Sequence, residues 1–288
     1  MTYRELLNKA DTELKKAGIA DHASCARIMI CEVTGLNMAA VLLHEQDKVS
    51  EAYEKRFEEI LSRRLSREPL EYIIGRTSFM GLDFFCTKDC LIPRFDTEIL
   101  AELAVREAGK AKERCERLGR EPRVLDMCTG TGCIGISVAV LAGVRDVTLS
   151  DISEDAVALA GRNAKANNAD VKILVSDLFG SVEGEFDIII SNPPYIAKDM
   201  IDKLEPEVAV YEPRLALDGG EDGLLFYRRI ISCAPQHLSR GAFLALETGE
   251  EQTEEVAGMM REAGLTDVTV HRDLAGLPRV VSGYKPVT

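Results

Sequence analysis

From residue 122 onward, short apolar segments alternate with longer segments whose apolar residues recur at helical spacing. Short runs rich in Val, Ile and Leu are typical of buried strands, and parallel strands need a long crossover between them, usually a helix. Strands are predicted at residues 124–125, 147–149, 171–175, 186–190, 242–246, 268–270 and 280–281. The sequence therefore predicts an α/β fold in which helices cover both faces of a mostly parallel sheet, with ligands bound at the carboxyl ends of its strands.

The first part of the chain has a different pattern, and we expect three regions in all. Residues 1–75 predict a small helical domain, because their apolar residues recur at helical spacing. Its predicted helices cover residues 6–17, 26–33 and 53–65. Residues 76–92 contain a short aromatic segment interrupted by glycine, which favours a hairpin that connects two domains. Residues 93–288 begin with a helix near Asp96 and carry the α/β pattern.

The chain is acidic, with 35 Lys/Arg, 48 Asp/Glu and a formal net charge of −13. Residues 1–72 contain 11 Lys/Arg and 13 Asp/Glu, so nearly all of the excess negative charge follows them. Direct nucleic-acid binding is disfavoured, because it needs a basic surface that neutralises phosphates and no segment is dense in basic residues. An acidic body suits a basic protein partner better.

Cysteine usage and hydropathy favour a cytoplasmic protein. Eight cysteines are present, but none form a C-x-x-C pair, so neither a disulfide framework nor a metal site is expected. No apolar run approaches the roughly 20 residues that a membrane span needs, and the N-terminus shows no secretion signal. We therefore expect no metal, no membrane partner and a reducing compartment.

A glycine-rich turn follows the strand that ends at Asp126, and it has the features of a cofactor site. The turn consists of Cys128, Thr129, Gly130, Thr131 and Gly132. Glycines allow a ligand to approach the backbone closely, and the next helix points its free N–H groups at whatever lies there. The carboxylate of S-adenosylmethionine would fit. A dinucleotide is an alternative, because the glycine spacing through Gly135 also fits that fingerprint.

Acidic residues end the next two predicted strands. Asp151 follows the second strand, where a carboxylate can accept hydrogen bonds from both ribose hydroxyls. Asp177 and Leu178 follow the third strand. We expect Asp177 to accept the adenine amino group and Leu178 to cover the adenine ring.

The fourth predicted strand leads directly into Asn192, Pro193, Pro194 and Tyr195. Two prolines fix the backbone and remove two N–H donors, while Asn192 supplies a carbonyl acceptor and Tyr195 a flat apolar face. Together these groups suit a planar substrate that bears an NH2. The Asn192 oxygen and a backbone carbonyl, that of Pro193, can each accept one N–H and aim the nitrogen lone pair at a methyl donor.

With these segments in place, the chain resembles the HemK/PrmC family of protein-(glutamine-N5) methyltransferases. The resemblance extends through nearly the whole sequence. The matching positions are residues 68–75, 92–94, 97–98, 126–132, 151–153, 156, 163, 191–196, 211–220, 222–224, 247, 249, 252, 275–276 and 279–280.

The resemblance implies a seven-stranded Rossmann-like S-adenosylmethionine methyltransferase fold whose last strand is antiparallel. It implies a substrate-docking role for residues 1–75, a catalytic domain at residues 93–288, and methylation of the glutamine in the Gly-Gly-Gln loop of class-I peptide-chain release factors. The implied cofactor contacts are Cys128, Thr129, Gly130, Thr131, Gly132, Asp151, Asp177, Leu178 and Asn192. The implied substrate contacts are Asn192, Pro193, Pro194 and Tyr195, of which Asn192, Pro193 and Tyr195 are expected to be catalytic.

Two positions depart from the family pattern. Cys128 and Phe95 stand where the family usually has a glycine and a second proline. The Cys128 side chain is expected to crowd the methionine end of the cofactor and to weaken its binding. Phe95 is expected to alter the shape of a loop near the pocket.

Four other functions are weighed against a release factor substrate. A ribosomal-protein glutamine is the nearest alternative, because the same active site would serve it. An adenine N6 or guanine N2 acceptor fits Asn192 to Tyr195 but not the acidic charge. A nicotinamide oxidoreductase is supported only by the glycine spacing, and a non-catalytic binding module would have no need of an intact Asn192 to Tyr195 segment.

Overall fold

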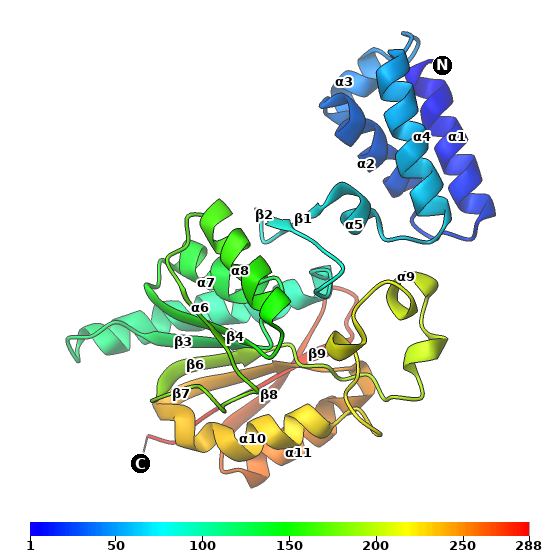
Figure 1. Cartoon of the computed structure of the whole chain (residues 1–288). Helices are drawn as coiled ribbons and strands as arrows, with labels where there is room; N and C mark the ends of the chain where they lie inside the picture. Colours follow the sequence, from blue (N-terminus) through cyan, green and yellow to red (C-terminus); the bar gives the residue numbers. More distant parts are fainter. Residues whose placement is uncertain (288) are drawn as a thin grey trace. The chain divides into compact units, whose positions relative to one another are not determined.

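The computed structural model describes residues 1–287, and the contacts within the chain group into two units (Figure 1). The helical unit contains Met1–Gly75 together with Glu205–Tyr211, which we call the inserted segment. The α/β unit contains Arg76–Leu204 and the chain from Glu212 onward. No described helix has the length and apolar character needed to cross a membrane.

The helical unit packs its helices around a core of its own. Its elements are α1 (Tyr3–Lys16), α2 (His22–Thr34), α3 (Met38–Leu43), α4 (Glu51–Leu65), α5 (Leu70–Ile74) and, in the inserted segment, α9 (Pro206–Ala209). Helix α1 begins at a capping box in which Thr2 and Glu5 each bind the backbone N–H of the other. Leu6, Ala10 and Leu14 recur at four-residue spacing and are fully buried against α2 and α4.

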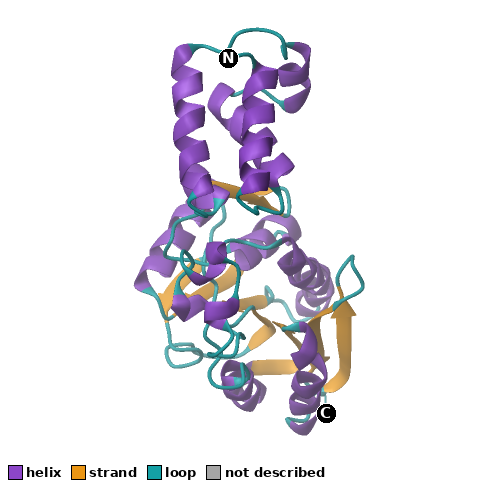
Figure 2. Cartoon of the chain, turned by 90° about the vertical axis from the view of Figure 1, so that its right-hand side faces the viewer, coloured by secondary structure: helices purple, strands orange, loops and turns teal. Residues whose placement is uncertain are grey.

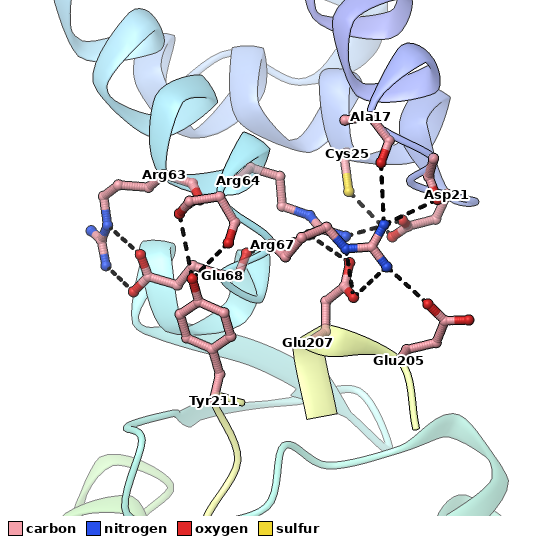
Figure 3. A network of polar contacts seen from close by, with 12 residues as sticks. Ala17, Asp21, Cys25, Arg63, Arg64, Arg67, Glu68, Glu205, Glu207 and Tyr211 are labelled. Atoms are coloured by element: carbon pink, nitrogen blue, oxygen red, sulfur yellow. Dashed lines mark hydrogen bonds and ion pairs between the residues drawn. The ribbon is translucent and has the colours of Figure 1, made fainter. Parts of the chain in front are cut away.

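The inserted segment is held to the N-terminal helices by buried charges (Figure 3). Glu207 accepts hydrogen bonds from Arg64 at 2.9 Å and from Arg67 at 2.9 Å. The Arg64 and Glu207 side chains are only 5% and 16% exposed, so this is a largely desolvated pair. At the end of the segment, the Tyr211 hydroxyl donates to the Ser66 carbonyl at 2.7 Å. A part of the chain remote in sequence thereby belongs to the helical unit.

The α/β unit is built on a seven-stranded sheet with strand order β5-β4-β3-β6-β7-β9-β8. Its strands are β3 (Arg123–Met127), β4 (Asp146–Asp151), β5 (Lys172–Val175), β6 (Phe186–Ser191), β7 (Leu238–Glu247), β8 (Thr266–Arg272) and β9 (Pro278–Tyr284). The first five pair in parallel, and β9 is antiparallel to both β7 and β8. The predicted seven-stranded fold with an antiparallel last strand is confirmed.

Helices cover both faces of the sheet (Figures 1 and 2). One buried cluster joins the sheet to α6 (Glu98–Glu116), α7 (Cys133–Ala142) and α8 (Glu154–Ala166). A second cluster joins the opposite face to α10 (Leu225–His237) and α11 (Thr253–Glu262). The remaining short elements of this unit are β1 (Arg76–Phe79), β2 (Leu82–Phe85), η1 (Phe95–Thr97), η2 (Ile201–Lys203), η3 (Arg214–Ala216) and η4 (Glu250–Gln252). Strand β6 is buried along its whole length, as a central strand must be.

The hairpin formed by β1 and β2 is part of the α/β unit and is tied to the glycine-rich turn. The link is Asn163, a fully buried side chain of α8. Its carbonyl oxygen accepts the Phe85 N–H at 2.8 Å, and its amide donates to the Thr131 carbonyl at 2.8 Å. The hairpin thus braces the turn on which we expect the cofactor to bind.

We predict that Glu207→Ala detaches the inserted segment. The substitution removes the nearest carboxylate from the desolvated Arg64 and leaves it only the more distant Asp21 at 3.5 Å, which costs about 3 kcal/mol for a buried pair. A urea titration should show the lost stability, and limited proteolysis should cleave residues 205–211 faster. Glu205→Ala is the matched control, because the Glu205 side chain is 78% exposed and its pair with Arg67 should be worth less than about 1 kcal/mol. Equal effects of the two substitutions would contradict this account of Glu207.

Candidate active site

A cavity of about 380 Å³ lies at the carboxyl ends of β5, β4, β3 and β6. Its size falls in the range of small-molecule binding sites. The residues predicted for the site that line this cavity are Cys128, Thr129, Gly130, Thr131, Asp151, Asp177, Leu178, Asn192 and Pro194. Gly132, Pro193 and Tyr195 are not among the described residues that line it. The structure thus brings two separate sequence signals, the glycine-rich turn and the Asn-Pro-Pro-Tyr segment, to one cavity.

The glycine-rich turn is organised from below by Asp126, which has no exposed surface. One oxygen of its carboxyl group accepts the Thr129 hydroxyl at 2.6 Å and the Gly135 N–H at 2.8 Å. Burial raises the pKa of Asp126 to about 7. The sequence predicted no role for Asp126, although an aspartate that ends an apolar strand shortly before glycines indicates one.

The glycines of the turn meet different demands. Gly130 lines the cavity at φ +52°, with no atom near the position of a Cβ. At Gly132 a Cβ would lie 2.7 Å from Ile136, and at Gly135 it would lie 2.2 Å from Leu149. Gly130 supplies backbone freedom beside the ligand, Gly132 adopts a left-handed backbone at φ +82° where the first turn of α7 leaves no room for a side chain, and Gly135 permits α7 to pack closely on the sheet.

Cys128 also has a left-handed backbone, at φ +58°. This conformation costs a residue with a Cβ roughly 1–2 kcal/mol, which is consistent with a preference for glycine at this position. Burial raises the pKa of the Cys128 thiol to about 12, so the side chain remains neutral.

Asp151, at the end of β4, is fixed by two backbone donors. Its two oxygens accept the Gly130 N–H at 2.9 Å and the Ser153 N–H at 3.0 Å. Burial raises the pKa of this carboxyl group above its usual value. Each oxygen keeps a lone pair for a ligand, so the pair of ribose hydroxyls fits here.

The remaining walls suit the adenine end of the cofactor. Leu178, Ile152 and Phe226 line the cavity with apolar surface. Asp177 is exposed and paired with Arg229 at 2.8 Å. Arg229 therefore competes for the Asp177 carboxylate, a contact that the sequence did not predict. Together with the free N–H groups at the start of α7, these residues fit S-adenosylmethionine.

The Asn-Pro-Pro-Tyr segment continues directly from β6. Ser191 anchors its start, because its hydroxyl donates to the Met127 carbonyl of β3 at 2.7 Å. The Asn192 amide donates to the Thr97 hydroxyl at 3.4 Å. Pro193 is buried, whereas Asn192 and Pro194 line the cavity. Burial raises the pKa of Tyr195 to about 12, so its phenol is neutral at physiological pH.

The chain that follows η3 supports this segment from behind. A Cβ at Gly219 would lie 2.7 Å from the Tyr195 Cα, and one at Gly223 would lie 2.4 Å from the Tyr195 carbonyl oxygen. The Gln252 amide donates to that same oxygen at 2.9 Å. The residue types in this stretch therefore follow from packing, because only glycine permits the two backbones to approach so closely.

An ion pair with a buried carboxylate holds the start of the same stretch. The Glu212 carboxylate accepts a hydrogen bond from Arg94 at 2.5 Å, and its side chain is 1% exposed. Pro213 and Leu215, which follow it, line the cavity. Phe95, which departs from the family pattern beside Arg94, is 81% exposed and is not among the described lining residues.

Comparisons with known proteins agree with this geometry. Residues 5–75 match the family described as PrmC N-terminal domain, and residues 113–210 match the family described as Methyltransferase small domain. A release factor glutamine methyltransferase of Geobacter sulfurreducens is 43% identical over 78% of this chain and 76% of its own length. One of Clostridium acetobutylicum is 36% identical over 98% of both chains. The chain belongs to the release factor glutamine methyltransferase family.

Membership of the release factor glutamine methyltransferase family confirms the predicted enzyme class and the S-adenosylmethionine cofactor. A solved methyltransferase of Pyrococcus furiosus has the same fold, with a TM-score of 0.54 and 20% identity over 78% of this chain and 99% of its own. The roles of the individual site residues remain predictions.

We predict that Gly223→Ala disrupts the acceptor side of the site. The added methyl group would force the Tyr195 carbonyl and Gln252 to move, because it would lie within 2.5 Å of both. A displacement near 1 Å at reacting groups can reduce turnover about 100-fold. Gly258→Ala is the matched control, since no atom lies within 4 Å of its Cβ position. Methyl-transfer rates of the two variants test this, and similar rates would contradict the supporting role of Gly223.

We predict that Asp151→Ala weakens binding of S-adenosylmethionine by roughly 10- to 100-fold. This range corresponds to losing hydrogen bonds to a charged group, about 1.5–3 kcal/mol. Asp146→Ala, at the opposite end of β4, should leave the affinity unchanged because its carboxylate pairs with Lys172. Isothermal titration calorimetry measures both variants. An unchanged affinity in Asp151→Ala would remove the ribose assignment.

Proposed function

We propose that this enzyme methylates the N5 nitrogen of the glutamine in the Gly-Gly-Gln loop of class-I peptide-chain release factors. The observation that carries the proposal is that Asn192 and Pro194 line the same cavity as Gly130 and Asp151. A methyl donor and an amide acceptor can therefore meet there. Relatives whose names give this activity are 34–43% identical to the chain.

On the acceptor side, we assign the glutamine amide to Asn192 and the backbone of Pro193. The Asn192 side-chain oxygen accepts one N–H and the Pro193 carbonyl accepts the other, which aims the nitrogen lone pair toward the cofactor side of the cavity. Tyr195 provides an apolar surface for the planar amide. Because a neutral amide is a weak nucleophile, holding it in one orientation supplies much of the rate enhancement.

On the cofactor side, residues 128–132 and the N-terminus of α7 would hold the methionine carboxylate, and Asp151 would hold the ribose. When bound, S-adenosylmethionine supplies an electrophilic methyl group on a sulfonium. The reaction needs no strong general base from the enzyme, because the amide nitrogen loses a proton readily once it carries the extra methyl group. The proton can therefore pass to water at the cavity mouth or to an adjacent acceptor oxygen.

The acidic charge of the chain favours a protein over a nucleic acid as the substrate. The helical unit is proposed to dock the release factor, and the reducing cytoplasm is the proposed location. A ribosomal-protein glutamine is the alternative substrate, because the geometry around Asn192 would serve any exposed glutamine amide equally well.

We predict that labelled S-adenosylmethionine transfers its methyl group to a purified release factor and that mass mapping places it on the Gly-Gly-Gln glutamine. A release factor with that glutamine changed to alanine is the matched control and should remain unlabelled. Asn192→Ala should abolish transfer, while cofactor affinity falls much less, because only the acceptor amide loses its main partner. Label on nucleic acid, or on a ribosomal protein alone, would overturn the proposed substrate. Near-normal turnover by Asn192→Ala would overturn its role.

A further inference from the structure

Glu247 is a buried carboxyl group beside the acceptor segment for which the sequence suggested no role. It is the last residue of β7, and its neighbour Leu246 pairs with Ser191 of β6. The residue is 3% exposed, and its Oε2 has no hydrogen-bond partner among the described residues. A buried carboxyl oxygen without a hydrogen-bond partner is costly, so its presence beside the acceptor segment points to a function.

The Glu247 carboxyl group ends a short chain of polar side chains that leads to Asn192. Glu247 follows Leu246, which pairs with Ser191, just as Asn192 follows Ser191, and the nearby Thr97 and Asn192 side chains favour the ionised form of its carboxyl group. The Asn192 amide also donates to the Thr97 hydroxyl at 3.4 Å. Thr97, at the end of η1, is itself buried. The order of the chain is therefore Asn192, Thr97 and Glu247.

An ionised Glu247 carboxylate can only accept hydrogen bonds, so it fixes which group donates and which accepts in the series Asn192, Thr97 and Glu247. The Thr97 hydroxyl must then donate to Glu247, which leaves its lone pairs for the Asn192 N–H groups. The NH2 end of the Asn192 amide consequently faces Thr97 and Glu247, and its oxygen faces the cavity. An asparagine side chain without such a neighbour could turn its amide by 180° and present N–H donors to the substrate instead.

We propose that Glu247 is a positioning residue that, directly and through Thr97, orients the Asn192 side chain with its oxygen toward the acceptor nitrogen. The inference rests on the proposed function of Asn192 and adds to it the group that fixes its orientation. Glu247 is outside the described lining of the cavity, so it acts on the substrate only through Asn192.

The protonation state of Glu247 should control the direction in which the hydrogen bonds between Glu247, Thr97 and Asn192 run. Burial, partly offset by Thr97 and Asn192, raises the pKa of Glu247 to about 7. A neutral Glu247 can donate to Thr97, whose hydroxyl could then donate to the Asn192 oxygen and reverse the amide. The charged or titratable groups that interact with Glu247 from neighbouring elements are Asp96, Cys133, Tyr195, Tyr227 and Arg279. Of these, Arg279 lowers the pKa of Glu247 and Asp96 raises it.

Two pairs of variants test the proposal with the full-length enzyme, S-adenosylmethionine and a release factor. Glu247→Gln removes the obligatory acceptor, while Glu107→Gln makes the same change at a buried glutamate of α6 that pairs with Lys110. Thr97→Val removes the hydroxyl at constant shape, and Thr97→Ser retains it. We expect kcat to fall about 10- to 100-fold in Glu247→Gln and in Thr97→Val but to stay within about threefold in Glu107→Gln and Thr97→Ser. Cofactor affinity by calorimetry and thermal unfolding should change little.

The pH profile distinguishes orientation from a structural role. Since the ionised form of Glu247 turns the Asn192 oxygen toward the substrate, kcat of the wild-type enzyme should rise as pH increases through about 7. Glu247→Gln should lack this rise. Parallel losses in all four variants, or an unchanged pH profile in Glu247→Gln, would overturn the proposal. Failure of the wild-type enzyme to label the release factor would instead overturn the proposed function, so the two failures are distinguishable.

Discussion

The central constraint of the site is the pairing of β6 with β3 on one side and β7 on the other. All six residues of β6 are buried, and hydrogen bonds to two neighbours leave this strand little freedom. Asn192 is the first residue after β6, so the sheet fixes the position of its backbone. The hydrogen bond from the Ser191 hydroxyl to the Met127 carbonyl links the end of β6 to β3, the strand that leads into the glycine-rich turn. The two parts of the cavity are therefore set by a single local pairing rather than by independent loops.

The two strands that flank β6 each carry a buried carboxyl group near their carboxyl ends. Asp126 of β3 holds the glycine-rich turn through Thr129 and Gly135, and Glu247 of β7 faces the Asn192 amide. Burial raises the pKa of each to about 7, which means that each costs stability when ionised. Such groups are retained where geometry matters more than stability, and perturbed carboxyl groups gather at functional sites for this reason. On this interpretation one carboxyl group serves each half of the reaction.

The sequence predicted the sheet well because its strands are apolar and its glycines and prolines mark the turns. Boundaries were less accurate where polarity interrupts a strand, as at Ser239 and Arg240 in β7. The short helices α3 and α5 were missed, because six and five residues are too few to show a helical period. Glu247 could not be assigned, since a glutamate that ends an apolar strand looks like any surface residue. Its neighbours include Val280 of β9 and Thr97 of η1, and both segments are distant from it in sequence.

The membership of the inserted segment was also invisible, because Arg64 and Glu207 are 143 residues apart and charged side chains suggest solvent exposure. The position of the inserted segment determines whether the helical unit can be removed or exchanged as one piece. The helical unit is discontinuous in sequence, so the chain passes between units at residues 75, 204 and 211. A cut after Gly75 would not isolate the α/β unit, because it would leave Glu207 without its arginines. Exchange of the helical unit between relatives would likewise require two segments to move together, one of which lies within the catalytic half of the gene.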